Sequence, residues 1–278
     1  MRRLIFTLAA VAVTLASAGP AKAGLIGLDS AFPTPHLYNV STTTGTATPF
    51  VTVTGGFTSL TGLAYLNGTL YATDVLAGQG FKFGSIDMAT GAFTVINNQG
   101  GSANWHGLAA NQAGNVLYSI DIDNGNRLVS VTPAGVITTI GPGAGIDGRG
   151  MAYDNGNGVL YATGSGAGTS LYTVNTTTGL ATLVGSTGIS SGFIGLAFDD
   201  ATGTLYMTAA PGGNGPSNLY TVNTTTGLAT LIGATGVSNL DGLEFIPTQA
   251  VPAPPAAVLA VLGLASVGGF RRLRAARG

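Results

Sequence analysis

Cysteine is absent from the 278 residues, and charged residues make up only 8% of them. Without cysteine the chain forms no disulfide and offers neither a thiol nucleophile nor a lipid-accepting cysteine near its start. The low charge also argues against intrinsic disorder, which requires high net charge and low hydrophobicity. Glycine, in contrast, is abundant at 45 residues, and many short apolar runs are separated by Gly, Asn and Thr. This pattern favours an all-β domain.

Basic residues are scarce in the central part of the chain. Residues 24–250 contain only Lys82, Arg127 and Arg149 but all eleven acidic residues, a formal charge of −8 that the overall value of −1 conceals. Nucleic-acid binding depends on clustered positive charge that contacts phosphates. We therefore expect no nucleic-acid partner.

The first 23 residues, MRRLIFTLAAVAVTLASAGPAKA, are typical of a secretory signal peptide. Two arginines precede an apolar run from Leu4 to Ala16, and Ala21-Lys22-Ala23 forms a small-x-small cleavage site before Gly24. The apolar run is too short for a membrane helix. No twin-arginine pattern follows the arginines, so we expect export by the general secretion route.

The other end, residues 250–278, combines a proline-rich motif, an uncharged stretch from Ala256 to Phe270 and an arginine-rich tail. This order resembles the PEP-CTERM sorting signal of Gram-negative bacteria. The matching residues are Val251, Pro252, Ala253 and Pro254 in the motif, and Arg271, Arg272 and Arg274 in the tail. Ala253 stands where the family has Glu.

The resemblance implies processing by an exosortase-type enzyme, transient anchoring in the inner membrane through a C-terminal membrane helix, and delivery to the cell surface or the extracellular polymer matrix. A plain C-terminal membrane anchor is the alternative. In both cases the basic tail stays in the cytoplasm and the domain lies beyond the inner membrane.

The central region repeats itself. The segment LYTVNTTTGLATLVGSTG at 171–188 returns at 219–236 with sixteen of eighteen letters unchanged. A second marker, GLAY or a near match, begins at residues 62, 107, 150, 195 and 242, with spacings of 43 to 47 residues. Each unit is predicted to contain four short strands, of the types GLAY, LYAT, LYTVN and LATLV. Four antiparallel strands in about 45 residues are typical of a β-propeller blade.

The ends of the repeat predict the number of blades. Four complete units begin at 62, 107, 150 and 195, and residues 242–247 add one further inner strand. The stretches from 24, 36 and 46 supply the three strands that complete a fifth blade. We therefore predict a five-bladed propeller over residues 24–249, closed by one C-terminal and three N-terminal strands. A larger number of irregular blades is the alternative. The chain resembles bacterial propellers that carry the LYTVNTTTG type of blade.

The candidate binding residues are those expected near one mouth of the propeller axis. Loops that lead into the inner strands place one residue before each GLA-type glycine; these are Thr61, His106, Arg149, Ile194 and Asp241. An aromatic ring beside hydrogen-bonding groups suits a carbohydrate. The predicted ligand-binding set is Trp105, His106, Asp147, Arg149 and Asp241. The alternative is that Trp105 packs between blades and His106 is an ordinary polar residue.

Catalytic and metal signals are weak. The segment 121–126, DIDNGN, begins like a calcium loop, but Gly125 comes one position early and Thr132 replaces the terminal Glu. We expect no metal, no cofactor and no enzymatic activity. The predicted function is that of an exported structural or binding propeller, with an exopolysaccharide or surface glycan as a candidate partner. The alternatives are a glycan-binding, lectin-like propeller and a hydrolase or lyase that uses the same mouth.

Overall fold

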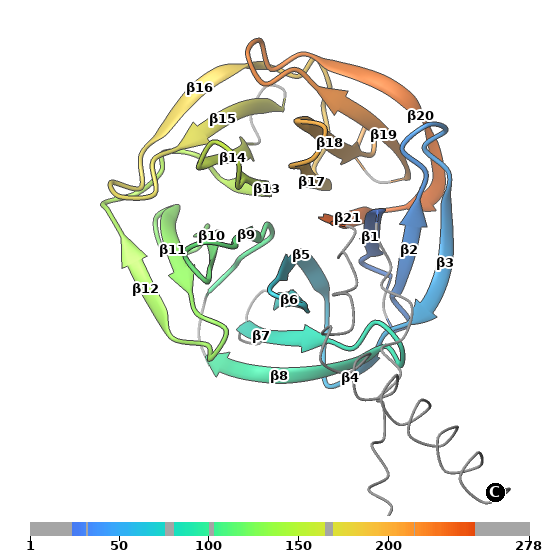
Figure 1. Ribbon diagram of the computed structural model, residues 1–278, viewed down its shortest axis with the longest axis horizontal. Coiled ribbons are helices and arrows are strands. Elements are labelled where there is room, and N and C mark those ends of the chain that lie inside the picture. The colour runs from blue at the N-terminus through green and yellow to red at the C-terminus, as the bar shows by residue number, and fades with distance from the viewer. Residues whose placement is uncertain are drawn as a thin grey trace, which may run out of the picture. The chain divides into compact units, whose positions relative to one another are not determined.

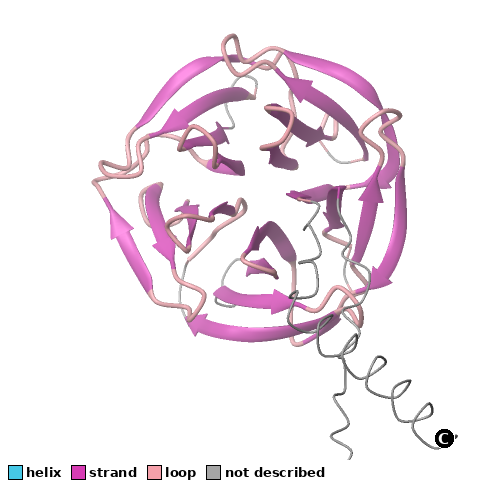
Figure 2. Ribbon diagram, viewed as in Figure 1, coloured by secondary structure: helices cyan, strands magenta, loops and turns pink. Residues whose placement is uncertain are grey.

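The computed structural model describes residues 24–31, 33–75, 81–99, 103–164, 169–213 and 215–247. One compact unit ends at Pro247, and the second unit, Thr248–Gly278, lies outside the described residues. The predicted signal peptide and sorting segment also lie outside them. The described part consists of strands, turns and loops (Figure 2), and it contains no helix with the length and hydrophobicity needed to span a bilayer.

Five sheets, each with four antiparallel strands and one of them with a further short strand, surround a central axis and form the blades of a propeller (Figure 1). The closing blade contains β21 (Leu240–Ile246), β1 (Gly24–Asp29), β2 (His36–Val40) and β3 (Ala47–Thr52). Blade one contains β5 (Leu60–Leu66), β6 (Thr69–Val75), β7 (Phe81–Ile86) and β8 (Ala92–Gln99). Blade two contains β9 (Ala109–Asn111), β10 (Val116–Asp121), β11 (Arg127–Val131) and β12 (Ile137–Ile140).

Blade three contains β13 (Gly148–Asp154), β14 (Val159–Gly164), β15 (Ser170–Val174) and β16 (Ala181–Ser186). Blade four contains β17 (Ile194–Asp199), β18 (Thr204–Ala209), β19 (Pro216–Val222) and β20 (Ala229–Ser238). In each blade the GLA-type segment lies at or beside the inner strand, and the fourth strand lies at the rim (Figure 1). The predicted all-β, five-bladed propeller is confirmed.

The ring closes between the two ends of the described chain. β21 pairs antiparallel with β1, with Leu25 opposite Phe245 and Gly27 opposite Leu243. Strand β1 then pairs with β2, and β2 with β3. This confirms the predicted closure by one C-terminal and three N-terminal strands, and it pairs two edges that would otherwise be open to other chains.

Aromatic pairs join neighbouring blades and explain the repeated Leu-Tyr marker. The tyrosine on the second strand of one blade stacks on the aromatic residue that ends the GLAY segment of the next. The ring centroids are 6.0 Å apart for Tyr118–Tyr153, 6.0 Å for Tyr161–Phe198 and 6.3 Å for Tyr206–Phe245. Aromatic pairs of this kind contribute about 0.5–1.5 kcal/mol beyond the burial of their area.

The repeated TTTG turns form joints between blades at the rim. The Asn175 side chain accepts hydrogen bonds from the backbone of Thr177 and Thr178, both at 2.9 Å, and Gly179 takes a φ of 75° that favours glycine. The turn of each later blade rests against the outer strand of the blade before it. A Cβ added at Gly185 of β16 would overlap the carbonyl oxygen of Thr226 in the next turn. The recurring glycines are therefore required by the close approach of two backbones.

Two features were not predicted. A short strand, β4 (Thr54–Gly55), adds to blade one by pairing parallel with β8. In blade two the inner strand begins only at Ala109, whereas the inner strands of the other blades begin before or beside the GLA-type glycine. In three blades a threonine of the second strand accepts a hydrogen bond from that glycine's N–H; these pairs are Thr73–Gly62, Thr163–Gly150 and Thr208–Gly195. Blade two carries Ile120 in the same place and lacks this hydroxyl.

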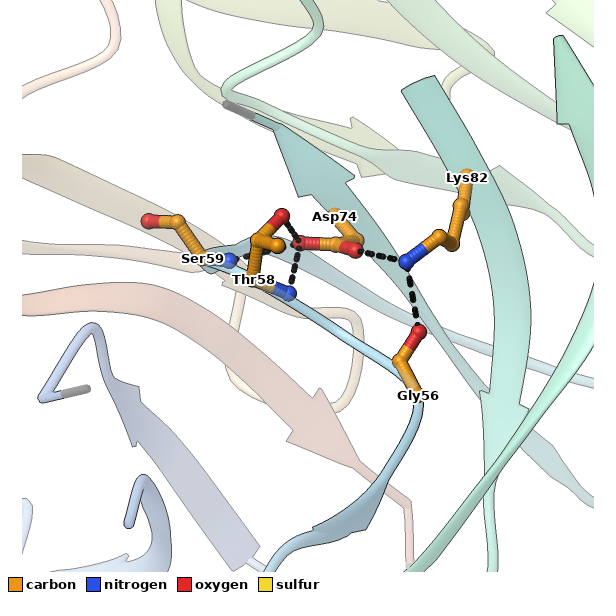
Figure 3. Close-up of polar contacts among 5 residues, drawn as sticks. All are labelled: Gly56, Thr58, Ser59, Asp74 and Lys82. Atoms are coloured by element: carbon orange, nitrogen blue, oxygen red, sulfur yellow. Dashed lines mark hydrogen bonds and ion pairs between the residues drawn. The ribbon is translucent and has the colours of Figure 1, made fainter. Parts of the chain in front are cut away.

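A buried carboxylate ties the segment between the closing blade and blade one to the body of blade one (Figure 3). One oxygen of Asp74 accepts hydrogen bonds from the backbone and hydroxyl of Thr58 and from the backbone of Ser59, at 2.6–2.9 Å. The other oxygen pairs with Lys82 at 3.2 Å, and Lys82 also donates to the carbonyl of Gly56. The Asp74 side chain is 1% exposed. Its charge is therefore fully partnered, as a buried charge requires.

Candidate functional site at the axial mouth

The propeller axis is almost filled by backbone. The GLA-type glycines form a ring in which each faces the inner strand of the next blade. An added Cβ at Gly107 would lie 2.8 Å from the Arg149 carbonyl oxygen, and one at Gly242 would lie 2.6 Å from that of Thr61. The cavity inside the ring has a volume of about 10 Å³. A cavity of this size holds about one water molecule.

Three of the five residues predicted at the mouth line this cavity. They are His106, Arg149 and Asp241. The other two are buried in the walls: Ile194 is 0% exposed, and the Thr61 hydroxyl lies 3.2 Å from the Thr73 hydroxyl. The sequence therefore predicted the ring of positions, and the packing decides which of its members reach the axis.

Asp241 is buried beside Arg149. One of its carboxylate oxygens accepts a hydrogen bond from the backbone N–H of Ile194 at 3.2 Å. Burial raises the pKa of Asp241 to about 7, against the lowering effects of the Ile194 hydrogen bond and the Arg149 charge. At neutral pH this carboxyl group is therefore divided between its protonated and ionised forms.

The positive charge of the Arg149 guanidinium acts on the titratable groups around it at the mouth. Its Nε lies 3.5 Å from a carboxylate oxygen of Asp147, and both side chains are partly exposed. Burial, together with the nearby positive charge of Arg149, lowers the pKa of His106 to about 4. His106 is therefore neutral at pH 7. The structure thus brings four of the five predicted ligand-binding residues together, namely His106, Asp147, Arg149 and Asp241.

Trp105, the fifth, lies in the core. It is 1% exposed and packs against Phe81, with ring centroids 4.1 Å apart. Its backbone carbonyl accepts a hydrogen bond from the Thr73 hydroxyl at 2.9 Å. This is the packing role that the sequence left open beside that of a ligand platform. A substitution at Trp105 would consequently test stability before it tested binding.

Polar atoms without hydrogen-bond partners gather near the same mouth. Within the described part of the chain, five buried side-chain atoms lack a hydrogen-bond partner, and three of them belong to Asn104, Trp105 and Arg149. Buried polar atoms are normally satisfied by protein or ordered water. Of these three, the Arg149 Nε is already ion-paired with Asp147 and the Trp105 side chain lies in the core, which leaves the Asn104 acceptor for water or a small polar ligand.

The opposite mouth carries a belt of polar residues that the sequence analysis missed. In three blades the residue five positions after the GLA-type glycine accepts a hydrogen bond from its counterpart in the previous blade. Gln112 accepts from the N–H of Asn67 at 3.0 Å, Asn155 from that of Gln112 at 2.8 Å, and Asp200 from that of Asn155 at 2.8 Å. Pro247 takes this position in the closing blade, where it offers neither a side-chain acceptor nor an N–H.

Glu244 lies in a cavity of about 40 Å³ behind this belt. Four blades have alanine at the third position of the GLA segment, and only the closing blade has glutamate. That single departure from the repeat is the signal that could have identified it. Burial raises the pKa of Glu244 well above its usual value, and the charge of Asp200 raises it further.

The weak calcium pattern at 121–126 is explained by turn geometry. Asp121 accepts hydrogen bonds from the backbone of Asn104 at 3.2 Å and from the Asn124 side chain at 2.7 Å. Among the residues with described positions, no three His, Asp or Glu side chains are grouped as a metal site requires. The carboxylates of this segment instead hold the loop that leads into blade two.

No protein-family model and no curated protein sequence matches the chain. Several solved structures, in contrast, are similar to the chain in fold. A chain in the crystal structure of a nidogen/laminin complex matches with a TM-score of 0.57 at 16% identity, covering 82% of this chain and all of that one. TolB from Acinetobacter baumannii matches with a TM-score of 0.50 at 15% identity over 77% of this chain, which spans 54% of that protein.

A putative TolB from Agrobacterium tumefaciens also has a TM-score of 0.50, at 12% identity, covering 81% of this chain and 91% of that one. At these identities the likeness extends to the fold alone, because propellers support many unrelated functions. The protein is a five-bladed β-propeller with TolB-like structural neighbours.

Proposed function

We propose that the chain is an exported propeller that binds or scaffolds at the cell surface or in the extracellular polymer matrix, without enzymatic activity. The observation that carries the proposal is the filled axis. A cavity of about 10 Å³ is far smaller than the roughly 300–1,000 Å³ of typical small-molecule sites, so a substrate cannot enter between the inner strands. The surfaces left for a partner therefore lie outside the axis.

Export is supported by the leader and tail patterns of the sequence, with an exosortase-type enzyme as the processing partner. Fractionation of cells that express the full chain tests this proposal. We expect a mature protein beginning at Gly24, recovered from the surface or the medium. Recovery of the uncleaved chain from the cytosol would refute export.

A glycan-binding function is the second candidate, and the unpartnered acceptor of Asn104 together with the partly exposed Arg149–Asp147 pair at the mouth favours it. A glycan array probed with residues 24–247 tests it. We expect Arg149→Gln to abolish binding and Arg127→Gln, an exposed arginine on β11, to leave it intact. Absence of any bound glycan would favour the scaffolding role. Turnover of a matrix polysaccharide by the wild-type protein would instead support the hypothesis of a hydrolase or lyase.

A further inference from the structure

The cavity behind the polar belt of the opposite mouth combines carboxylates with aromatic rings. Its wall contains Glu244 of β21 and Asp200, which directly follows β17. The rings of Tyr153, Phe198 and Phe245 also line it, from blades three and four and from the closing blade. Its volume of about 40 Å³ holds about three water molecules. The cavity is therefore large enough for a small polar group.

The charge in this cavity is unbalanced. Glu244 and Asp200 act on each other as like charges, and no lysine, arginine or histidine is among the described residues that line the cavity. Elsewhere in the domain a basic residue accompanies a buried carboxylate, as Lys82 does for Asp74. A buried carboxylate is stable in its charged form only when a counter-charge or several hydrogen-bond donors lie against it. The cavity therefore favours a positively charged ligand.

Turn geometry does not explain Glu244. A buried aspartate without a basic partner can hold a turn, as Asp154 does by accepting hydrogen bonds from the backbone and side chain of Asn157 at 2.9 and 2.8 Å. Glu244 lies within β21 instead, and the backbone N–H of Tyr65 donates to it. An ionised carboxylate accepts about four hydrogen bonds. Glu244 therefore retains acceptor positions for a ligand.

We propose that this cavity binds the ammonium group of a small primary amine, with Glu244 and Asp200 as its counter-charges. An ammonium group donates three hydrogen bonds and carries the charge that balances the two carboxylates. Asn155 orients Asp200 for this contact, since its backbone N–H and its side-chain amide donate to the two carboxylate oxygens at 2.8 and 3.1 Å. The aromatic rings add cation–π attraction where a ring face lies within about 6 Å of the charge.

The chemistry of the wall favours an ammonium group over a metal ion. Calcium takes about six to eight oxygen ligands, whereas three of the residues that line this cavity are aromatic. In the described part of the chain, no three His, Asp or Glu side chains are grouped for a metal. The carbon chain of the amine extends to solvent past Asp200 and Pro247, which are exposed. The site is separate from the candidate glycan site, which lies at the other mouth.

Binding is expected to release a proton from Glu244. Before a cation binds, burial and the charge of Asp200 hold the pKa of Glu244 well above its usual value, so the carboxyl group keeps its proton where free glutamate has lost it. The ammonium charge offsets both effects and favours the ionised form. Affinity should therefore rise with pH as Glu244 titrates. Tyr65 and Tyr153, the tyrosines beside it, stay neutral because burial raises their pKa as well.

The direct test is a calorimetric titration of residues 24–247 with butylammonium chloride, in phosphate buffer at constant ionic strength. We expect saturable binding of one amine per domain. Glu244→Ala gives the closing blade the alanine of the other four blades, and it should weaken binding at least about tenfold because the charge pair is lost. Glu244→Gln keeps the shape of the side chain and removes its charge, and it should weaken binding similarly. Thermal unfolding of both variants checks that they fold.

The matched control is Asp87→Asn, which removes one negative charge from an exposed turn of blade one. It should leave amine binding unchanged, which separates the cavity from the general attraction of a cation to an acidic domain. Equal weakening in Asp87→Asn and Glu244→Gln would overturn the proposal. Absence of saturable binding to the wild-type protein would overturn it equally.

Competing cations identify the group that binds. Tetramethylammonium has no N–H donor and should bind at least about tenfold more weakly than butylammonium. Displacement of butylammonium by a lower concentration of calcium chloride would overturn the assignment to an amine. A lysine-containing peptide distinguishes a free amine from a protein side chain as the source of the ammonium group. The proposal requires the free amine to bind at least as tightly as this peptide, and the reverse order would refute it.

Discussion

Blades three and four differ from the closing blade and blade one in how they are held together. Blades three and four join at the rim through bare backbone, where Gly185 meets the Thr226 carbonyl group. The closing blade and blade one make the same kind of contact, where Gly91 meets the Thr52 carbonyl group, but they add charge in the Asp74–Lys82 pair that binds the connecting segment. Regular repeats pack by repeating one backbone contact. The segment that connects the closing blade to blade one is held by side chains that occur once.

The largest effect on the free energy of unfolding is expected when the contact between Asp74 and Lys82 is removed. Asp74→Ala should lower the free energy of unfolding by about 4 kcal/mol, because it removes four hydrogen-bonding or ionic contacts and leaves the Lys82 ammonium without its carboxylate. Urea denaturation of residues 24–247 would measure it.

The control for Asp74 is Asp87→Ala, in an exposed turn where the carboxylate caps Ala89 and Thr90. We expect a clearly smaller loss there. Equal losses at the two sites would show that the Asp74 connection has no special role in holding the segment.

The next effect concerns the buried carboxyl group at the axis. Asp241 has a pKa of about 7 in the folded protein and about 3.8 when unfolded, so the folded state retains the proton between these values. Wild-type stability should therefore fall as the pH rises through this window. Asp241→Asn stays neutral and should gain about 4 kcal/mol relative to wild type between about pH 4 and about pH 8.

If the free energy of unfolding depended on pH in the same way in the two proteins, this interpretation of Asp241 would be contradicted. Because Glu244 titrates in both proteins, the difference between them isolates the Asp241 contribution. Asparagine can still accept the hydrogen bond from Ile194, so the comparison keeps the local geometry.

A smaller loss is expected at the uncharged joint. Gly185→Ala should destabilise the fold by about 2 kcal/mol, because the new methyl group meets the carbonyl of Thr226 and forces the next turn to shift. The control is Gly192→Ala, where no atom lies within 4 Å of the added Cβ. Thermal unfolding should separate the two variants. Similar melting temperatures would mean that the backbone at Gly185 and Thr226 can move apart at little energetic cost.

The smallest effect on stability is expected at the rim itself. Thr182→Lys with Thr230→Lys should change the free energy of unfolding of the monomer by less than about 0.5 kcal/mol, since both positions are exposed. A large loss of monomer stability would show that these strands are constrained in ways that their exposure does not reveal.

Much of the fold could be predicted because a repeat reports its own period. The five GLA-type glycines marked the inner strands, and the leftover pieces at 24–52 and 242–247 indicated how the ring closes. The strand β4 and the late start of β9 could not be predicted. Both depend on a single local partner: a parallel register with Ala92, and the absence of a threonine hydroxyl at Ile120.

The candidate site was only partly accessible to the same reasoning. The positions before each glycine were found, but a repeat cannot tell which members face the axis. Trp105 turned into the core against Phe81, while His106 and Arg149 reached the cavity. Glu244 was overlooked because it replaces an alanine in a strand otherwise identified by its small residues.

By itself the sequence determined the architecture of this protein, because periodic glycines and alternating apolar residues leave few ways to bury their faces except as blades around an axis. Only the tertiary structure decided the rest. The approach of the inner strands sets the axial cavity at about 10 Å³, and the same approach buries Asp241 and raises its pKa. The exposure of large apolar side chains at the rim likewise follows from which strand lies outermost, which is a property of the assembled ring. These side chains are Leu180, Leu183, Leu228 and Leu231.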